Sequence, residues 1–217
     1  MKYAIIPVTP FQQNCSMLVD DETQRAAVID PGGDVDRIIT TAEKNGITIE
    51  RILLTHGHLD HASAAGELSQ RLGGIPIEGP HEDEKFLIDN LPNQCASYGF
   101  PSFPTFTPRW LKEGDTVSFG NETLEVIHCP GHTPGHIVFF HRGRGLAIVG
   151  DVIFAGSVGR TDFDFKGKPY GDFDTLAHSI RDKLFPLGDD VEFIPGHGPN
   201  STFGRERQTN PYVGDDA

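Results

Sequence analysis

Thr55-His56-Gly57-His58-Leu59-Asp60-His61 places three imidazoles and one carboxylate within a single short stretch of the chain. The apolar run just before it, residues 51–54, predicts a short buried strand, and residues 62–68 after it predict the start of a helix. Imidazole nitrogens and carboxylate oxygens are suitable ligands for a divalent cation such as Zn²⁺. We therefore expect a metal site at a strand-to-helix turn; the simpler alternative is a polar loop exposed to solvent.

The composition is that of a globular protein rich in turns. The chain has 217 residues, of which 37% are hydrophobic, with 25 Gly and 16 Pro, and this length predicts one domain over residues 1–217. The formal net charge of −13 disfavours nucleic acid and anionic membranes as partners, because both attract cationic surfaces. We expect a monomer that acts on a small molecule.

The cysteines and the N-terminus bear on the cellular compartment. Cys15, Cys95 and Cys129 are scattered and form no Cys-x-x-Cys pair, which favours a reducing environment over a disulfide framework. The sequence contains no long apolar span and no secretory leader pattern. These features predict a cytoplasmic protein without a membrane segment.

Alternating apolar patterns and turn residues predict two successive sets of strands, each interrupted by helices. We expect strands at residues 3–8, 14–20, 26–29, 47–54, 75–77, 110–119, 123–127, 137–140, 146–149 and 191–194, and helices at about 34–44, 61–72, 81–91 and 172–185. This order predicts the α/β class, as an αββα sandwich of two mixed sheets flanked by helices. Residues 91–108, which contain four prolines, are expected to form a long irregular loop that either covers the site or covers an edge of the core.

Further candidate ligands follow other predicted strands. His132 lies in the segment Pro130-Gly131-His132-Thr133-Pro134-Gly135-His136, Asp151 follows Gly150, and His197 lies in Pro195-Gly196-His197. Strand ends meet along one edge of a sheet, where α/β proteins commonly bind ligands. Together with the first motif this makes seven ligands, more than one tetrahedral zinc ion uses. Two metal ions that share one carboxylate can use all seven.

These motifs, in this order and over nearly the whole chain, resemble those of the metallo-β-lactamase superfamily. The sequences Thr-His-Gly-His-Leu-Asp-His and Cys-Pro-Gly-His-Thr-Pro-Gly-His are most similar to glyoxalase II, the hydroxyacylglutathione hydrolase. The resemblance implies that His56, His58 and His132 bind one metal, that Asp60, His61 and His197 bind the other, and that Asp151 bridges them. It further implies two divalent metals, zinc by default with iron or manganese as alternatives, and hydrolysis of S-D-lactoylglutathione by a metal-bridging hydroxide held by Asp60 and Asp151.

The chain departs from full-length glyoxalase II in ways that affect the thiol part of the substrate. We expect the helical C-terminal domain that helps to hold glutathione in that family to be absent or reduced to one short element, as in short bacterial glyoxalase II-like hydrolases. Arg160 stands where the family has a lysine, and either binds a substrate carboxylate or forms a structural ion pair. Lys166 and Tyr170 are weaker candidates for substrate contacts. Asp30 and His136 are expected to orient ligand histidines from behind, although Asp30 also suits a turn or a helix cap.

Two alternative functions remain open on the sequence. A persulfide dioxygenase, an oxidoreductase with one iron, has the same fold and a similar Gly-Arg-Thr-Asp segment. A lactonase or another ester hydrolase of this fold is also compatible with the motifs.

Overall fold

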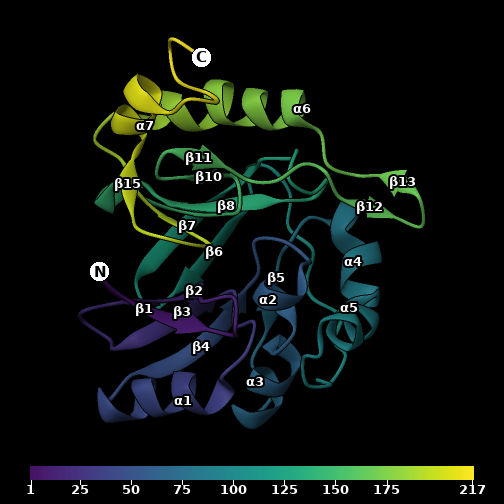
Figure 1. Ribbon diagram of the computed structural model, residues 1–217. Coiled ribbons are helices and arrows are strands. Elements are labelled where there is room, and N and C mark those ends of the chain that lie inside the picture. The colour runs from purple at the N-terminus through teal and green to yellow at the C-terminus, as the bar shows by residue number, and fades with distance from the viewer.

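The computed structural model describes residues 1–217 and contains two β-sheets that lie face to face with helices outside them (Figure 1). The first sheet has the order β1-β2-β3-β4-β5, and the second has the order β15-β14-β9-β8-β7-β6. The strands of the first sheet are β1 (Lys2–Val8), β2 (Gln13–Val19), β3 (Arg25–Ile29), β4 (Thr48–Leu53) and β5 (Ile77–Glu78). Those of the second are β6 (Thr116–Phe119), β7 (Glu122–His128), β8 (Ile137–His141), β9 (Leu146–Gly150), β14 (Glu192–Pro195) and β15 (Ser201–Thr202). The predicted αββα arrangement is therefore confirmed.

Helices cover the outer face of each sheet, and two small hairpins extend the second half of the chain (Figure 1). The helices beside the first sheet are α1 (Val35–Lys44), α2 (Leu59–Ala62), α3 (Ala65–Arg71), α4 (Lys85–Asp89) and α5 (Leu91–Tyr98). Those beside the second are α6 (Phe173–His178), which continues with wider π-type turns over Ser179–Leu184, and α7 (Phe203–Thr209). The hairpins pair β10 (Ile153–Phe154) with β11 (Ser157–Val158), and β12 (Asp164–Phe165) with β13 (Lys168–Pro169).

The layers follow from the two-residue period of the strands. In β3, Ala26 and Val28 pack against the helices, whereas Ala27 and Ile29 face the second sheet. In β8, Val138 and Phe140 pack toward α6 and α7, and the alternate residues face the first sheet. Because nearly all of these side chains are fully buried, these two inner strands are apolar on both faces.

The prediction of an irregular loop over residues 91–108 is wrong for its first half, because α5 occupies Leu91–Tyr98. Pro92 lies in the first turn, where a missing N–H costs no helical hydrogen bond, and Gly99 ends the helix with a left-handed φ of 71°. Phe100, Phe103 and Phe106 pack against the core between the first sheet and its helices. These rings therefore cover an edge of the core, as the simpler interpretation held.

Strand directions bring the candidate ligands to one edge of the sandwich. β7 and β9 are both antiparallel to β8, and β14 is parallel to β9, so these three strands end on the same side. The loop after β4 joins that edge, because the Ile137 N–H donates to the Thr55 carbonyl at 2.9 Å. The Asn14 N–H likewise donates to the Gly196 carbonyl at 2.7 Å. The loops that carry the histidines are thus hydrogen-bonded across the two sheets.

Candidate metal centre

Three imidazole nitrogens converge at the edge of the sandwich. His58 Nδ1 lies 3.1 Å from His56 Nε2 and 3.0 Å from His132 Nε2, and all three side chains are largely buried. Burial lowers the pKa of each ring, that of His58 to about 3, so the rings are neutral. Neutral imidazoles at these separations direct lone pairs toward a common point, as a transition-metal ion requires.

The outward nitrogen of each ring has a hydrogen-bond partner that determines its tautomer. His56 Nδ1 lies 3.0 Å from the Thr55 hydroxyl, which itself donates to Asp30. His132 Nδ1–H donates to the Arg160 carbonyl at 2.7 Å. His58 Nε2 lies 3.0 Å from the Tyr170 hydroxyl. With the proton on these outward nitrogens, the inward nitrogens are left as acceptors for a metal.

Asp60, His61 and His197 form a second group beside the first. Asp60 Oδ2 lies 3.2 Å from His197 Nε2 and 3.8 Å from His61 Nε2. His61 is oriented from behind by Asp30, whose Oδ2 lies 2.9 Å from Nδ1. His197 is the most accessible of the three, with 32% of its side chain exposed, whereas His61 is fully buried.

Asp151 lies between the two groups. Its Oδ1 is 3.4 Å from His61 Nε2, and its Oδ2 is 3.7 Å from His132 Nε2 and 3.8 Å from His197 Nε2. The Asp151 N–H donates to His136 Nε2 at 3.1 Å, and the His136 ring stacks on His56. His136 therefore contacts the first group and the backbone of Asp151.

Two buried polar atoms of this site lack hydrogen-bond partners, as expected of atoms that bind cations. His61 Nε2 and Asp151 Oδ1 are buried and have no hydrogen-bond partner, although buried polar atoms are normally satisfied. Burial opposes charge on both groups, yet their mutual attraction raises the pKa of His61 and holds that of Asp151 far below its usual range. An excess of carboxylate oxygens and imidazole lone pairs around two points is the donor set of a dinuclear metal site.

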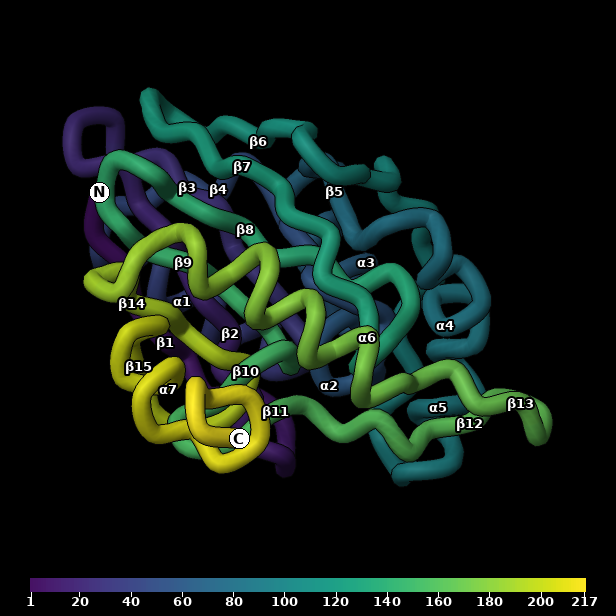
Figure 2. Tube along the Cα trace, turned by 90° about the horizontal axis from the view of Figure 1, so that it is seen from above, coloured from purple at the N-terminus to yellow at the C-terminus, as the bar shows by residue number.

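A cavity of about 610 Å³ opens onto these residues. It is lined by metal-site residues and by aromatic side chains, among them Phe11, Tyr98, Phe154, Phe163, Phe165 and Tyr170. Figure 2 shows the β12–β13 hairpin reaching over to α4 and α5, and Phe86 of α4 packs against both Phe165 and Tyr170. The hairpin thus forms one wall of the cavity, and a small ligand there would meet mostly apolar surface.

The predicted substrate contacts are placed unequally. Arg160 lines the cavity, but its guanidinium forms two hydrogen bonds of 2.9 Å with Asp162 and lies over the Phe163 ring. Tyr170 lines the cavity and contacts His58. Lys166 lies over the Phe165 ring and does not line the cavity. The aromatic wall was not anticipated, because its members are spread from residue 11 to residue 170.

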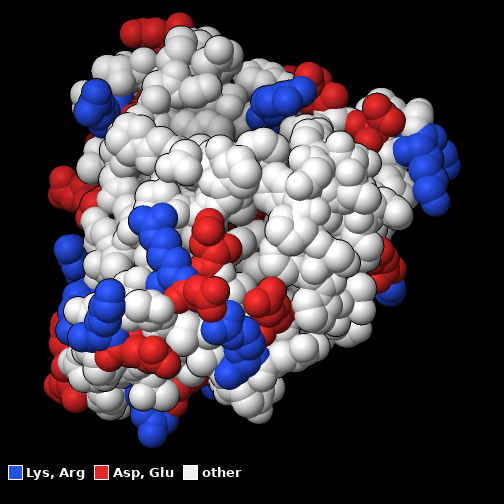
Figure 3. All heavy atoms as spheres, turned by 60° about the horizontal axis from the view of Figure 1, so that its bottom comes forward, with Lys and Arg blue, Asp and Glu red and all other residues white.

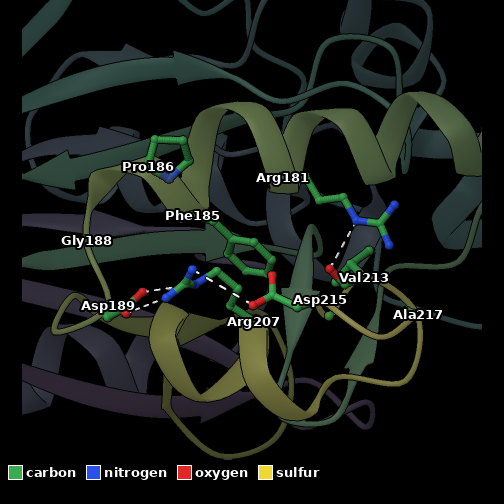
Figure 4. A pocket seen from close by; sticks show the side chains of 10 residues that line it. Arg181, Phe185, Pro186, Gly188, Asp189, Arg207, Val213, Asp215 and Ala217 are labelled. Carbon is green, nitrogen blue, oxygen red and sulfur yellow. Dashed lines mark hydrogen bonds and ion pairs between the residues drawn. The ribbon is translucent and has the colours of Figure 1, made fainter.

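A second hollow lies outside the second sheet, between α6, α7 and the last residues of the chain (Figure 4). Arg207 projects between Asp189 and Asp215, and its Nε and Nη2 donate to the Asp189 carboxylate at 3.1 and 2.6 Å. Arg181 Nε donates to the Val213 carbonyl at 3.1 Å. Both arginines are therefore engaged in holding the C-terminal segment against the helices, and the hollow has no chemistry comparable to that of the metal centre.

Charged side chains of both signs lie close together on the surface. On the face shown in Figure 3, acidic and basic side chains alternate, and neither sign forms a continuous patch. None of the helices has the length and apolar character needed to span a bilayer.

Two facing sheets with helices outside, and clustered His and Asp side chains at one edge, define an α/β protein with a candidate metal-binding site. The chain belongs to the metallo-β-lactamase superfamily, whose family model matches residues 8–199. It is 47% identical to hydroxyacylglutathione hydrolase GloC of Haemophilus influenzae, over 98% of both chains.

Solved structures agree with this assignment. BLEG-1, a B3 metallo-β-lactamase, superposes with a TM-score of 0.88 at 32% identity, over 98% of this chain and 99% of that one. TTHA1623 in a di-iron-bound form superposes with a TM-score of 0.83 at 30% identity, over 96% of this chain and 99% of that one. The protein therefore has the metallo-β-lactamase fold over nearly its whole length, and this fold is that of a metal-dependent hydrolase.

Proposed function

We propose that this protein is a metal-dependent thioester hydrolase that converts S-D-lactoylglutathione to D-lactate and glutathione. The observation that carries the proposal is that His56, His58 and His132 are neutral and have hydrogen-bonded outward nitrogens, which leaves their converging inward nitrogens as acceptors. The hydroxyacylglutathione hydrolase activity named for the 47% identical H. influenzae relative supports the choice of substrate. The same proposal treats residues 1–217 as one domain.

The residues divide into two metal sites in this proposal. His56, His58 and His132 hold one ion, and Asp60, His61 and His197 hold the other, with Asp151 contributing to both. Two bound divalent ions supply an activated water at neutral pH and polarise a carbonyl group. The protein's own contribution is to orient the ligands: Asp30 fixes His61, the Arg160 carbonyl fixes His132, and His136 holds the Asp151 backbone.

No side-chain nucleophile is part of this chemistry. Cys129, which follows β7 and precedes the ligand His132, is fully buried, and burial raises the pKa of its thiol well above the usual range. A thiol in this state is a poor nucleophile. The buried, unpaired Cys15 and Cys95 fit the proposed cytoplasmic location of the enzyme.

We propose that both metal ions are zinc, because zinc prefers four-coordinate sites with nitrogen and oxygen ligands. Iron is supported by the di-iron form of TTHA1623, and manganese accepts the same imidazole and carboxylate ligands. The substrate side of the proposal places the acyl group over the metal centre and the thiol part along the aromatic wall. Arg160 is then the cation nearest to a glutathione carboxylate, in competition with Asp162.

The test combines metal analysis of the purified protein with assays on S-D-lactoylglutathione, on glutathione persulfide and on a panel of other esters and lactones. We expect about two metals per chain, rapid thioester loss, and loss of that activity in His58→Ala. One iron per chain, oxygen uptake with glutathione persulfide and no thioester hydrolysis would instead establish the dioxygenase. Two metals with turnover only of other esters or lactones would move the proposal to that substrate class.

A further inference from the structure

Glu84 is a buried carboxylate that the proposed chemistry does not use. It ends the turn before α4, and its side chain has no exposure to solvent. Its Oε2 accepts the Gly57 N–H and its Oε1 accepts the Gly135 N–H, both at 2.8 Å. One carboxylate therefore joins the loop that carries His56 and His58 to the loop that carries His132.

The approach of Glu84 explains why both loops have a glycine at these positions. A Cβ on Gly135 would lie 2.7 Å from Glu84 Cγ and 2.8 Å from its backbone nitrogen. A Cβ on Gly57 would lie 3.0 Å from Glu84 Oε2 and 2.7 Å from the Cβ of Leu87. Such separations are too short for a side chain, so each loop lacks one where the Glu84 carboxylate contacts its backbone.

Helix α5 also forms hydrogen bonds with the backbone of the loop that carries His56 and His58. Gln94 of α5 donates to the Gly57 carbonyl at 3.1 Å and accepts the Leu59 N–H at 3.2 Å. Gln94 contacts one loop only, whereas Glu84 contacts both. His58 and His132 have ring nitrogens 3.0 Å apart. Their relative position therefore depends on the Glu84 side chain, which forms no hydrogen bond with either ring.

We propose that Glu84 is a positioning residue of the first metal site, which sets the His56–His58 loop and the His132 loop at the spacing that one metal ion needs. This inference rests on the proposed dinuclear centre. It predicts that Glu84 acts on metal affinity and not only on folding, because its two acceptor oxygens fix two loops that bind the same ion.

Glu84→Gln tests the proposal with little change in volume. The amide keeps one acceptor oxygen but turns an N–H₂ donor toward the other backbone N–H, so one of the two loops is released. Glu206→Gln is the matched control, since Glu206 is also buried and accepts a glycine N–H, from Gly156 at 2.8 Å, away from the first site. Cobalt(II) titration reports occupancy through its visible absorption, and competition with a chelator gives the affinity of each ion.

We expect Glu84→Gln to weaken binding of one of the two Co²⁺ ions by about 10- to 100-fold, with the second ion little affected, and to change the visible spectrum of that site. Glu206→Gln should lower thermal stability while both Co²⁺ affinities stay within a few-fold of wild type. Equal metal affinities in wild type and Glu84→Gln, or equal losses in the two variants, would overturn the proposal.

Gly135→Ala provides an independent variant that displaces the Glu84 carboxylate without removing it. It should reproduce the loss of the same ion, and wild-type affinity in Gly135→Ala would count against the inference even if Glu84→Gln fails to fold. The metal readout also separates this inference from the proposed function. A wild-type protein that binds two ions but leaves the thioester intact would refute the substrate and leave the role of Glu84 to be decided by the titrations.

Discussion

Asp30 Oδ2 lies 2.9 Å from His61 Nδ1, and both side chains are buried. The same carboxylate accepts the Thr55 N–H at 2.8 Å and the Thr55 hydroxyl at 2.6 Å. Asp30 has a left-handed φ of 55°, which Asp and Asn adopt more readily than other side-chain-bearing residues. One residue just after β3 thus orients a proposed ligand of the second site and anchors the start of the loop that carries His56 and His58.

Asp30→Asn should weaken metal binding while the fold is retained. Asn keeps the size and the backbone preference, but its amide nitrogen must face a donor from either His61 or Thr55. We expect a 10- to 100-fold loss in metal affinity, measured by chelator competition. Asp34→Asn is the control, because Asp34 also has a left-handed φ, of 51°, and is exposed; wild-type affinity in Asp30→Asn would contradict the role proposed for Asp30.

Removal of the metals should lower thermal stability without abolishing the fold. The hydrophobic clusters between and outside the sheets contain none of the seven proposed ligands, so the sandwich does not need the ions to form a core. A ligand present at 100 times its Kd adds about 2.7 kcal/mol, which corresponds to a Tm change of roughly 5–10 °C for a chain of this size. Calorimetry with and without a chelator measures the shift, and a double variant, His58→Ala with His61→Ala, should show almost none of it.

The candidate ligand set was accessible from sequence because its members lie in short segments that follow apolar strands and contain Gly. His132, Asp151 and His197 follow β7, β9 and β14, and the common direction of those strands brings them together. Their roles as ligands remain predictions. The sequence predicted that these side chains meet at one edge of the sheet, and the position of that edge depends mainly on strand pairing.

Other parts of the site depend on tertiary placement that local patterns do not encode. Glu84 belongs to the acidic run Glu82-Asp83-Glu84, which has the composition of a solvated turn, yet burial raises the pKa of its carboxyl group to about 7. Tyr170 contacts His58 although more than a hundred residues separate them in the chain. Helix α5 was missed because Pro92 resembles a helix breaker unless its position in the first turn is known.

Arg160→Ala distinguishes a substrate contact from a structural ion pair. His132, a proposed ligand, donates to the backbone carbonyl of Arg160, which the substitution leaves in place. If the guanidinium binds a glutathione carboxylate, KM for S-D-lactoylglutathione should rise about five-fold, equivalent to ~1 kcal/mol for an exposed charge pair. A neutral thioester of N-acetylcysteamine should show no such rise, and Asp162→Ala, which frees the guanidinium, should lower KM for the glutathione thioester. Equal effects on the charged and the neutral substrate would indicate a structural role.

Gly196 and Gly198 flank His197, and their substitution by alanine should have different effects on metal binding. A Cβ on Gly196 would overlap Asp151 Oδ1 and lie 2.6 Å from His61 Cε1, whereas a Cβ on Gly198 would meet nothing within 4 Å. Gly198 has a φ of 79°, so alanine there costs about 1 kcal/mol of backbone strain.

We therefore expect Gly196→Ala to lose bound metal and thioesterase activity, because the added methyl group displaces the carboxylate that lies between the two ligand groups. Gly198→Ala should keep its metal and show only a reduced free energy of unfolding. Metal analysis and denaturant unfolding of the two variants check both statements. Full metal content in Gly196→Ala would mean that Asp151 does not need its present position to serve the centre, and its assignment as the shared ligand would have to be abandoned.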